Sequence, residues 1–325
     1  MPVTHIGRLS ALGHLFGLDV VHPKVARVLE LGCGTGANIL AMAQLFPEGK
    51  FVGVDYSESQ IELARSVTKG SGITNVQFLH ADVCDLGKDL GEFDYIISHG
   101  VYSWISDTAK KALLRISKEN LSRNGIAYVS YNCLPGWKMR GALRDMMLMH
   151  TGNLKDPMEK VGQSKALLEF LAGACNQDSS YGQFLSAELN LLLKCDDSYI
   201  AHEFLEDEND AFYFSDFNRD VQSFGLQYLG DAEPASMMMA DISEDAQKVF
   251  SQLKGNQIAI EQYLDFLRNR TFRCSLLCHS ELKFDRNIKP KRVKGMTAVS
   301  LIEAKQAQEG DQPAIFSTQS GDEIT

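Results

Sequence analysis

Three closely spaced glycines, Gly32, Gly34 and Gly36, separate a β-rich run at residues 25–31 from a helical pattern at 38–46. Glycine allows a tight turn and lets a ligand approach the backbone closely. The amide groups at the start of the following helix point toward whatever lies at that turn. The pattern predicts the first strand–turn–helix unit of a nucleotide-binding fold, with a purely structural turn as the alternative.

Strand-like and helix-like segments alternate through residues 1–150. A first helix is expected at 4–18, with Thr4 as its N-cap, because apolar residues recur there at helical spacing. Further β-rich runs and helical patterns follow the glycine turn, the former at 50–55, 76–79, 93–98 and 126–131 and the latter at 59–69 and 109–120. Strands that alternate with helices form right-handed crossovers and a parallel sheet. We therefore predict a doubly wound α/β domain here.

Residues 151–285 have mainly helical patterns, and two arrangements are open for them. They form a separate helical domain, or else only about 151–210 is an insertion and residues 225–279 donate the last two strands of the sheet. The second arrangement is preferred, because a sheet that ends at 126–131 would leave an open edge to cover.

Residues 286–325 are predicted to form a basic linker and a tail. The linker carries its charge on Arg286, Lys289, Lys291, Arg292 and Lys294. The tail, about 307–325, is rich in Gln, Gly, Ser and acidic residues, so we expect it to be disordered.

Length and charge limit the classes of function. A chain of 325 residues with a net charge of -10 suits two domains and argues against nucleic-acid binding, which needs clustered Lys and Arg. No segment reaches the roughly 18 apolar residues needed to span a bilayer, and the N-terminus lacks the apolar core of a signal peptide. The seven scattered cysteines are expected to be reduced thiols of a cytoplasmic protein.

The glycine turn alone does not identify its ligand. Gly32, Gly34 and Ala37 also fit a dinucleotide fingerprint, and Asp55 follows Gly34 by 21 residues, where an NAD enzyme has its ribose-binding acid. An NAD oxidoreductase is therefore an alternative at this point.

Three acidic residues at the ends of three successive strands favour a different ligand. A carboxylate at Glu30 would repel a pyrophosphate, yet it suits a ligand with an ammonium and a sulfonium. Asp82 follows the third strand, where its carboxylate can accept a hydrogen bond from an adenine amine. Together with Asp55, they suit a cationic adenosyl amino acid better than an anionic dinucleotide.

These residues, with the strand Phe93-Asp94-Tyr95-Ile96-Ile97, resemble the motif series of class I S-adenosylmethionine-dependent methyltransferases. The resemblance implies that the glycines line the methionine part of the donor, that Asp55 binds the ribose and that Asp82 with Val83 holds the adenine. The full set of donor-binding residues expected on this basis is Glu30, Gly32, Cys33, Gly34, Gly36, Asp55, Tyr56, Ser57, Ala81, Asp82, Val83 and His99. S-Adenosylhomocysteine would be the product.

A narrower resemblance rests on three segments, 98–104, 130–137 and 199–204. They are similar to bacterial methyltransferases with an attached methyltransferase regulatory domain, a group that includes protein-lysine methyltransferases acting on rickettsial outer-membrane proteins. Those lysine enzymes are longer, with a further C-terminal domain. The resemblance marks His202-Glu203 as a domain signature.

The acceptor is expected beyond the carboxyl ends of the fourth and fifth strands. A sulfonium is an activated donor, so the protein must mainly align the reactants and exclude water. We predict that the substrate meets Tyr102, Trp104 and Trp137, whose aromatic walls suit an amine, although core packing is an alternative for both tryptophans. His99 is predicted to be the general base, with a hydrogen-bond donor to the substrate or a structural histidine as the alternatives. Tyr131 and Asn132 are predicted to orient the amine.

Other readings remain beside a protein-lysine acceptor. The chain would otherwise be a small-molecule methyltransferase, or a regulatory protein that binds S-adenosylmethionine without turnover. No metal site is predicted, because the spacing of Cys274, Cys278 and His279 is not that of zinc ligands. The helical region could supply a homodimer interface.

Overall fold

The central sheet of the computed structural model reverses its strand order beside β1. The structure describes residues 2–239, 242–253, 255–294, 296, 303–306, 315–317 and 323–324. The sheet has the order β3-β2-β1-β4-β5-β8-β7, and β6 pairs with β5. Its strands are β1 (Arg27–Leu31), β2 (Lys50–Asp55), β3 (Val76–His80), β4 (Phe93–Ser98), β5 (Leu121–Cys133), β6 (Ala211–Phe212), β7 (Leu226–Asp231) and β8 (Phe272–His279). Strands β1 to β5 are parallel, and β8 is antiparallel to β5 and β7. This is the predicted doubly wound α/β fold.

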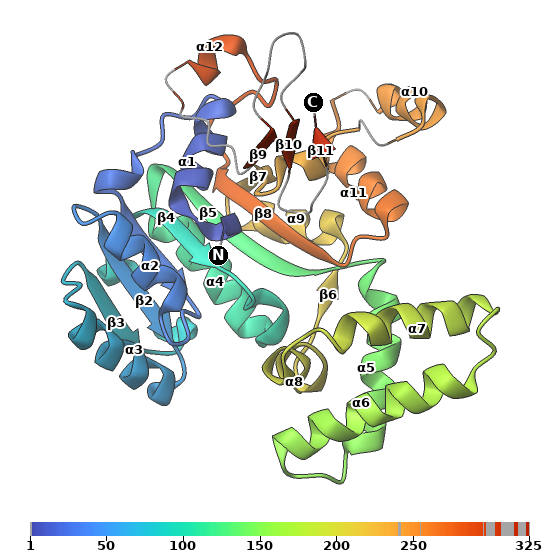
Figure 1. Ribbon diagram of the computed structural model, residues 1–325. Coiled ribbons are helices and arrows are strands. Elements are labelled where there is room, and N and C mark those ends of the chain that lie inside the picture. Colours follow the sequence, from blue (N-terminus) through green and yellow to red (C-terminus); the bar gives the residue numbers. More distant parts are fainter. Residues whose placement is uncertain are drawn as a thin grey trace. The chain divides into compact units, whose positions relative to one another are not determined.

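Each strand buries alternate residues in two different cores, because successive side chains point to opposite faces of a sheet. In β4, Tyr95 and Ile97 belong to one core and Ile96 belongs to the other. The first core is closed by α1 (Ile6–Leu15), α2 (Ala37–Leu45) and α3 (Glu58–Ser71), and the second by α4 (Asp107–Glu119) and α9 (Phe214–Ser223). Figure 1 shows helices on both sides of the sheet. Among the described residues, no helix is both long and apolar enough to cross a membrane.

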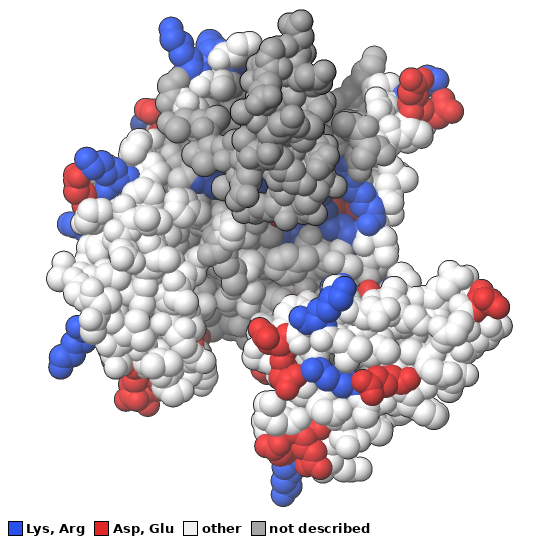
Figure 2. Space-filling model, in the orientation of Figure 1, with Lys and Arg blue, Asp and Glu red and all other residues white. Residues whose placement is uncertain are grey.

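Four helices form a lobe with a core of its own. They are α5 (Trp137–Thr151), α6 (Pro157–Ala174), α7 (Ser180–Leu192) and α8 (Asp197–Leu205). Strand β5 leads into the lobe, and the chain returns through β6, which pairs with β5 at Asn132 and Cys133. On the visible face of the lobe, acidic and basic side chains lie next to one another (Figure 2). The lobe contains the ion pairs Arg140–Glu188 and Lys165–Asp197.

The structure therefore has the second of the two expected arrangements. The lobe is an insertion after β5, and β7 and β8 complete the sheet. Residues 1–287 form a single compact unit, so 151–285 is not a separate one. The first helix begins at Ile6 and is capped by the His5 side chain, whereas Thr4 is buried.

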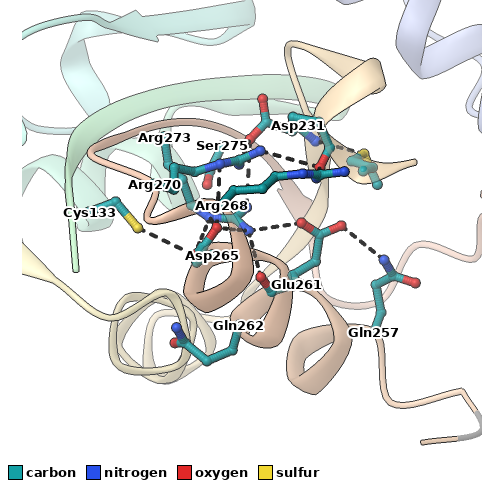
Figure 3. A network of polar contacts seen from close by, with 12 residues as sticks. Cys133, Asp231, Gln257, Glu261, Gln262, Asp265, Arg268, Arg270, Arg273 and Ser275 are labelled. Atoms are coloured by element: carbon teal, nitrogen blue, oxygen red, sulfur yellow. Dashed lines mark hydrogen bonds and ion pairs between the residues drawn. The ribbon is translucent and has the colours of Figure 1, made fainter. Parts of the chain in front are cut away.

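A buried ion network joins helix α11 (Gln257–Arg268) to β8 (Figure 3). The guanidinium of Arg273 donates to the Asp265 carboxylate at 2.8 Å and to Glu261 Oε2 at 2.9 Å, and all three side chains are fully buried. Arg270 pairs with Asp231 at the end of β7, at 3.1 Å. Charged groups thus hold this helix to the edge of the sheet. Helix α10 (Glu244–Gln252) precedes α11.

The C-terminal unit, residues 288–325, contains α12 (Pro290–Val293) and an antiparallel sheet of the order β11-β10-β9. Its strands are β9 (Glu303–Gln306), β10 (Ile315–Ser317) and β11 (Glu323–Ile324). The last two strands lie in the stretch predicted to be disordered, and the rest of that stretch lies outside the described residues. The Arg286 side chain is not part of a solvated linker, because it donates to the carbonyls of Tyr228 and Leu229.

Candidate functional site

The glycine turn is built as the sequence predicts, but its three glycines have different tasks. All three have positive φ, of 72°, 51° and 77° at Gly32, Gly34 and Gly36. A side chain at Gly32 would meet Val101 at 2.3 Å, and one at Gly36 would meet Phe78 at 2.5 Å. At Gly34 the nearest atom is 4.0 Å away. Gly32 and Gly36 are therefore needed for packing, and Gly34 leaves space that a ligand can fill.

Asp55 is tied to the glycine turn at the end of β2. Its Oδ2 accepts a hydrogen bond from the Gly34 amide at 2.7 Å, and its Oδ1 accepts one from the Ser57 amide at 2.9 Å. Each carboxylate oxygen has a second lone pair, so the group can still accept two hydroxyl donors. Ser57 occupies the N-cap position of helix α3 and does not line the cavity described next, whereas the exposed Tyr56 does.

A cavity of about 470 Å³ lies at the carboxyl ends of β1, β2 and β3. We call it the glycine-loop cavity; among its lining residues are Gly32, Gly34, Asp55, Tyr56, Ala81, Asp82, Val83, Gly100, Trp104 and His202. Asp82 Oδ1 accepts a hydrogen bond from the Cys84 amide at 2.8 Å. Seven of the expected donor-binding residues thus share one cavity.

Glu30 does not line the glycine-loop cavity, and only 4% of its surface is exposed. Asn38 donates to its Oε1 at 2.7 Å, while Oε2 has no hydrogen-bond partner among the residues that the structure describes. Burial raises the pKa of Glu30 to about 7. A buried carboxylate with a free oxygen suits a cationic ligand, because such an oxygen is costly to leave unpaired. Cys33 and Gly36 also support the turn without lining the cavity.

A second cavity, of about 500 Å³, adjoins the first. We call it the aromatic cavity; it is lined by His99, Gly100, Trp104, Trp137, Arg140, Tyr199, His202, Glu203, Thr271 and Phe272. Gly100, Trp104 and His202 line both cavities. The rings of Trp104 and His202 are stacked, with their centroids 4.8 Å apart, and Trp104 Nε1 donates to the His202 carbonyl at 3.1 Å. A ligand in one cavity can therefore meet a ligand in the other at these residues.

His99 lines the aromatic cavity and not the glycine-loop cavity. Its Nδ1 lies 2.8 Å from the Tyr128 hydroxyl and 3.2 Å from that of Ser130, which itself accepts the Gly100 amide. Burial lowers the pKa of His99 and raises that of Tyr128, so both are uncharged at neutral pH. Nδ1 is thus engaged by two hydroxyl groups, and which atom donates depends on the tautomer of the ring. The role of His99 as a general base stays a prediction.

Three predicted acceptor residues lie elsewhere. Tyr131 is fully buried, stacks on Phe217 at 4.1 Å and contacts the Ser275 hydroxyl at 3.2 Å. Tyr102 packs edge-on against Tyr131 in the same core. Asn132 is also buried, and its side chain donates to Asn209. The predictions for these three residues were wrong, because β5 continues to Cys133 and keeps Tyr131 and Asn132 inside the sheet.

The sequence did not assign Glu203, Tyr199 and Arg140 to a site. Arg140 comes from α5, directly after β5, whereas Tyr199 and Glu203 come from α8, the last helix of the lobe. Tyr199 and Glu203 are four residues apart, which places them on one face of α8. The segment 199–204 was noted as a domain signature only, although this spacing could have revealed a functional helix face.

The cysteines and histidine of β8 have structural roles. His279 Nε2 contacts the Leu121 carbonyl and its Nδ1 contacts Lys118 Nζ, both at 3.0 Å. In the described part of the chain, no group of three or more His, Cys, Asp or Glu residues is placed to hold a metal ion.

Two family models match this chain. One, described as a methyltransferase domain, matches residues 22–206, and the other, a predicted methyltransferase regulatory domain, matches residues 196–279. Two Rickettsia prowazekii proteins are similar to this chain. Uncharacterized protein RP789 is 39% identical over 95% of this chain and 56% of its own length. Uncharacterized protein RP028 is 38% identical over 66% of this chain and 86% of its own length.

Two solved structures of PKMT2 from Rickettsia typhi have the same fold. One superposes with a TM-score of 0.86 at 36% identity, over 94% of this chain and 58% of PKMT2. The other, in complex with AdoHcy, has a TM-score of 0.91 at 33% identity, over 100% of this chain and 64% of PKMT2. The chain thus spans less than two thirds of RP789 and of PKMT2.

Proposed function

Because this chain belongs to the family of S-adenosylmethionine-dependent methyltransferases that carry a methyltransferase regulatory domain, we propose that it methylates the side-chain amine of a protein lysine. The observation that carries this proposal is the pair of adjoining cavities, which share Gly100, Trp104 and His202. The family assignment removes the NAD alternative.

The donor fits the glycine-loop cavity. Gly34 leaves room beside the backbone, Asp55 and Asp82 keep free acceptor lone pairs for ribose and adenine, and Glu30 has an unpaired oxygen for an ammonium. When bound there, S-adenosylmethionine supplies an activated methyl group. The chain's own contribution is to orient the two reactants and to exclude water.

The aromatic cavity suits an alkyl amine. Its walls combine indole, phenol and phenyl rings with one carboxylate, that of Glu203, and aromatic faces attract ammonium groups. A lysine side chain offers such a group at the end of a thin alkyl stem. Support also comes from the likeness to PKMT2, one of whose structures holds AdoHcy, and from the sequence resemblance to rickettsial protein-lysine methyltransferases. The seven cysteines are all free thiols, which supports a reducing compartment such as the cytoplasm.

The acceptor class is tested with methyl-labelled S-adenosylmethionine, the purified chain and a cell lysate separated into protein and small-molecule fractions. We expect label in protein bands. Label confined to the small-molecule fraction would favour the alternative of a small-molecule methyltransferase, which a 500 Å³ cavity can also serve. Tight donor binding without transfer to either fraction would favour a regulatory protein.

Donor binding is expected to strengthen as the pH rises from about 6 to 7.5. The pKa of Glu30 is raised to about 7 in the folded chain, so below that pH the carboxyl is protonated and cannot pair with the donor's ammonium. Calorimetry in buffers of different ionisation enthalpy should therefore show proton release on binding. Glu30→Gln should bind more weakly and independently of pH over this range.

Glu30→Gln has a second expected effect, on stability. A carboxyl whose folded pKa is raised destabilises the chain progressively as the pH rises from its unfolded pKa of about 4.5 through about 7. The ligand-free variant should consequently be more stable than the wild type at pH 8, by an amount on the order of 3 kcal/mol. A variant that is less stable at pH 8, with unchanged donor affinity, would contradict the proposed role.

Replacing Trp104 by alanine is expected to lower kcat/KM for the protein acceptor by about 10- to 30-fold, because a desolvated cation–π contact contributes up to about 2 kcal/mol. Trp104→Phe keeps an aromatic wall but lacks the Nε1 donor to the His202 carbonyl. It should retain most of the activity. Steady-state kinetics of both variants distinguish the effect of the aromatic ring from that of the Nε1 hydrogen bond. Unchanged kinetics in Trp104→Ala would place the acceptor channel elsewhere.

A further inference from the structure

Glu203 is a nearly buried carboxylate on the wall of the aromatic cavity, with 7% of its surface exposed. Its backbone carbonyl accepts a hydrogen bond from Asn209 Nδ2 at 2.7 Å. Its carboxylate, in contrast, accepts none from any residue that the structure describes. Because this carboxylate faces the cavity without a protein partner, it is open to a cationic ligand there.

The charged and titratable groups around Glu203 do not complete it. Arg140, from α5, lowers the pKa of Glu203 electrostatically, but its Nε donates to Glu188 of α7 at 3.2 Å. His202 and His99 have pKa values lowered by burial, so both rings are neutral at pH 7.

Tyr199, one turn before Glu203 on α8, has its pKa raised by burial, so its phenol also stays neutral. The same loss of water raises the pKa of Glu203 to about 7. Among the residues that line the aromatic cavity, Glu203 is the one acidic side chain.

We propose that Glu203 binds the ammonium of the acceptor amine and removes its proton before methyl transfer. This inference rests on the proposed function and names the residue that prepares its acceptor. Glu203 lines the aromatic cavity together with His202 and Trp104, and these two residues also line the glycine-loop cavity.

The proton balance follows from this placement. An ammonium has no lone pair, so one proton must leave before nitrogen can attack. That proton passes to the Glu203 carboxylate, which becomes a carboxylic acid. As the N–C bond to the methyl group forms, the S–C bond of the donor breaks and the sulfonium becomes a neutral thioether. The methylated nitrogen takes up the positive charge, and Glu203 then loses its proton to solvent.

Tryptophan fluorescence gives a direct test, because Trp104 and Trp137 are the two tryptophans of the chain and both line the aromatic cavity. The full chain saturated with S-adenosylhomocysteine is titrated with n-butylammonium, which mimics a lysine side chain, and with uncharged 1-butanol. We expect Glu203→Gln to weaken n-butylammonium binding at least tenfold and to leave 1-butanol binding unchanged.

Glu208→Gln is the matched control, since Glu208 is an exposed carboxylate outside the cavity. It should bind both probes as the wild type does. Glu203→Gln should unfold at an equal or higher temperature than the wild type at pH 8, because it removes a buried charge. Methyl transfer to protein should fall by about 10²- to 10³-fold in Glu203→Gln and lose the activity increase near pH 7.

The two proposals fail in different ways. If the wild type methylates lysine and Glu203→Gln retains its n-butylammonium affinity and its rate, the role of Glu203 is overturned while the proposed function stands. If the wild type labels no protein but n-butylammonium binding still depends on Glu203, the amine-binding role is supported and the lysine acceptor is overturned.

Discussion

Replacing Arg273 by methionine is expected to destabilise the chain by about 3–5 kcal/mol, the usual consequence of removing one partner from a buried ion pair. The guanidinium neutralises Asp265 and Glu261, and the hydrophobic substitute would leave Glu261 buried without a cation and Asp265 with Arg270 alone, at 3.4 Å. Urea unfolding followed by far-UV circular dichroism measures the effect. Arg219→Met is the matched control, because Arg219 pairs with Asp216 on the surface, where an ion pair contributes about 0–1 kcal/mol.

A triple variant separates the loss of charge from the loss of packing. Arg273→Met combined with Asp265→Asn and Glu261→Gln removes the uncompensated charges and keeps similar shapes. It should recover much of the stability that the single variant loses. If the triple variant is as unstable as the single one, packing of Arg273 over the Phe214 ring, 4.1 Å away, explains the effect instead.

Asp55→Asn is expected to weaken S-adenosylmethionine binding by about 100-fold or more. Hydrogen bonds to a charged group contribute about 1.5–3 kcal/mol each, and the amide replaces one of two acceptor oxygens by a donor. That oxygen also holds the Gly34 or the Ser57 amide, so the glycine turn loses a tether as well. Calorimetry with S-adenosylhomocysteine provides the measurement.

The control for Asp55→Asn is Asp89→Asn, an exposed carboxylate that does not line the glycine-loop cavity. It should bind the product as tightly as the wild type. Equal affinity in both variants would mean that Asp55 does not hold the ribose.

The sequence predicted seven residues that line the glycine-loop cavity, because the turn and the strand ends are local features. Glycine spacing and acids at the ends of consecutive strands follow directly from chain order. Even there, burial separated the residues. Asp55 and Asp82 line the cavity, while Glu30 is buried outside its lining and has one unpaired oxygen.

The lining of the aromatic cavity was harder to predict, because it is assembled from segments distant in the sequence. The sequence identified Trp104 and Trp137 as candidates. Glu203 and Tyr199 lie on α8, which reaches the cavity because the chain returns to β5 through β6. The error at Tyr131 arose from the end of one strand. Two additional strand residues keep its ring in the core, since side chains alternate between the faces of a sheet.

The most direct test of the account is to identify the amino acid that receives the methyl group. The purified chain is incubated with methyl-labelled S-adenosylmethionine and lysate proteins, and the labelled protein is hydrolysed and separated into its amino acids. The account predicts that the label is recovered in methylated lysine and that Glu203→Gln greatly reduces it. Label in another amino acid, or no label in protein while S-adenosylmethionine binds, would contradict it.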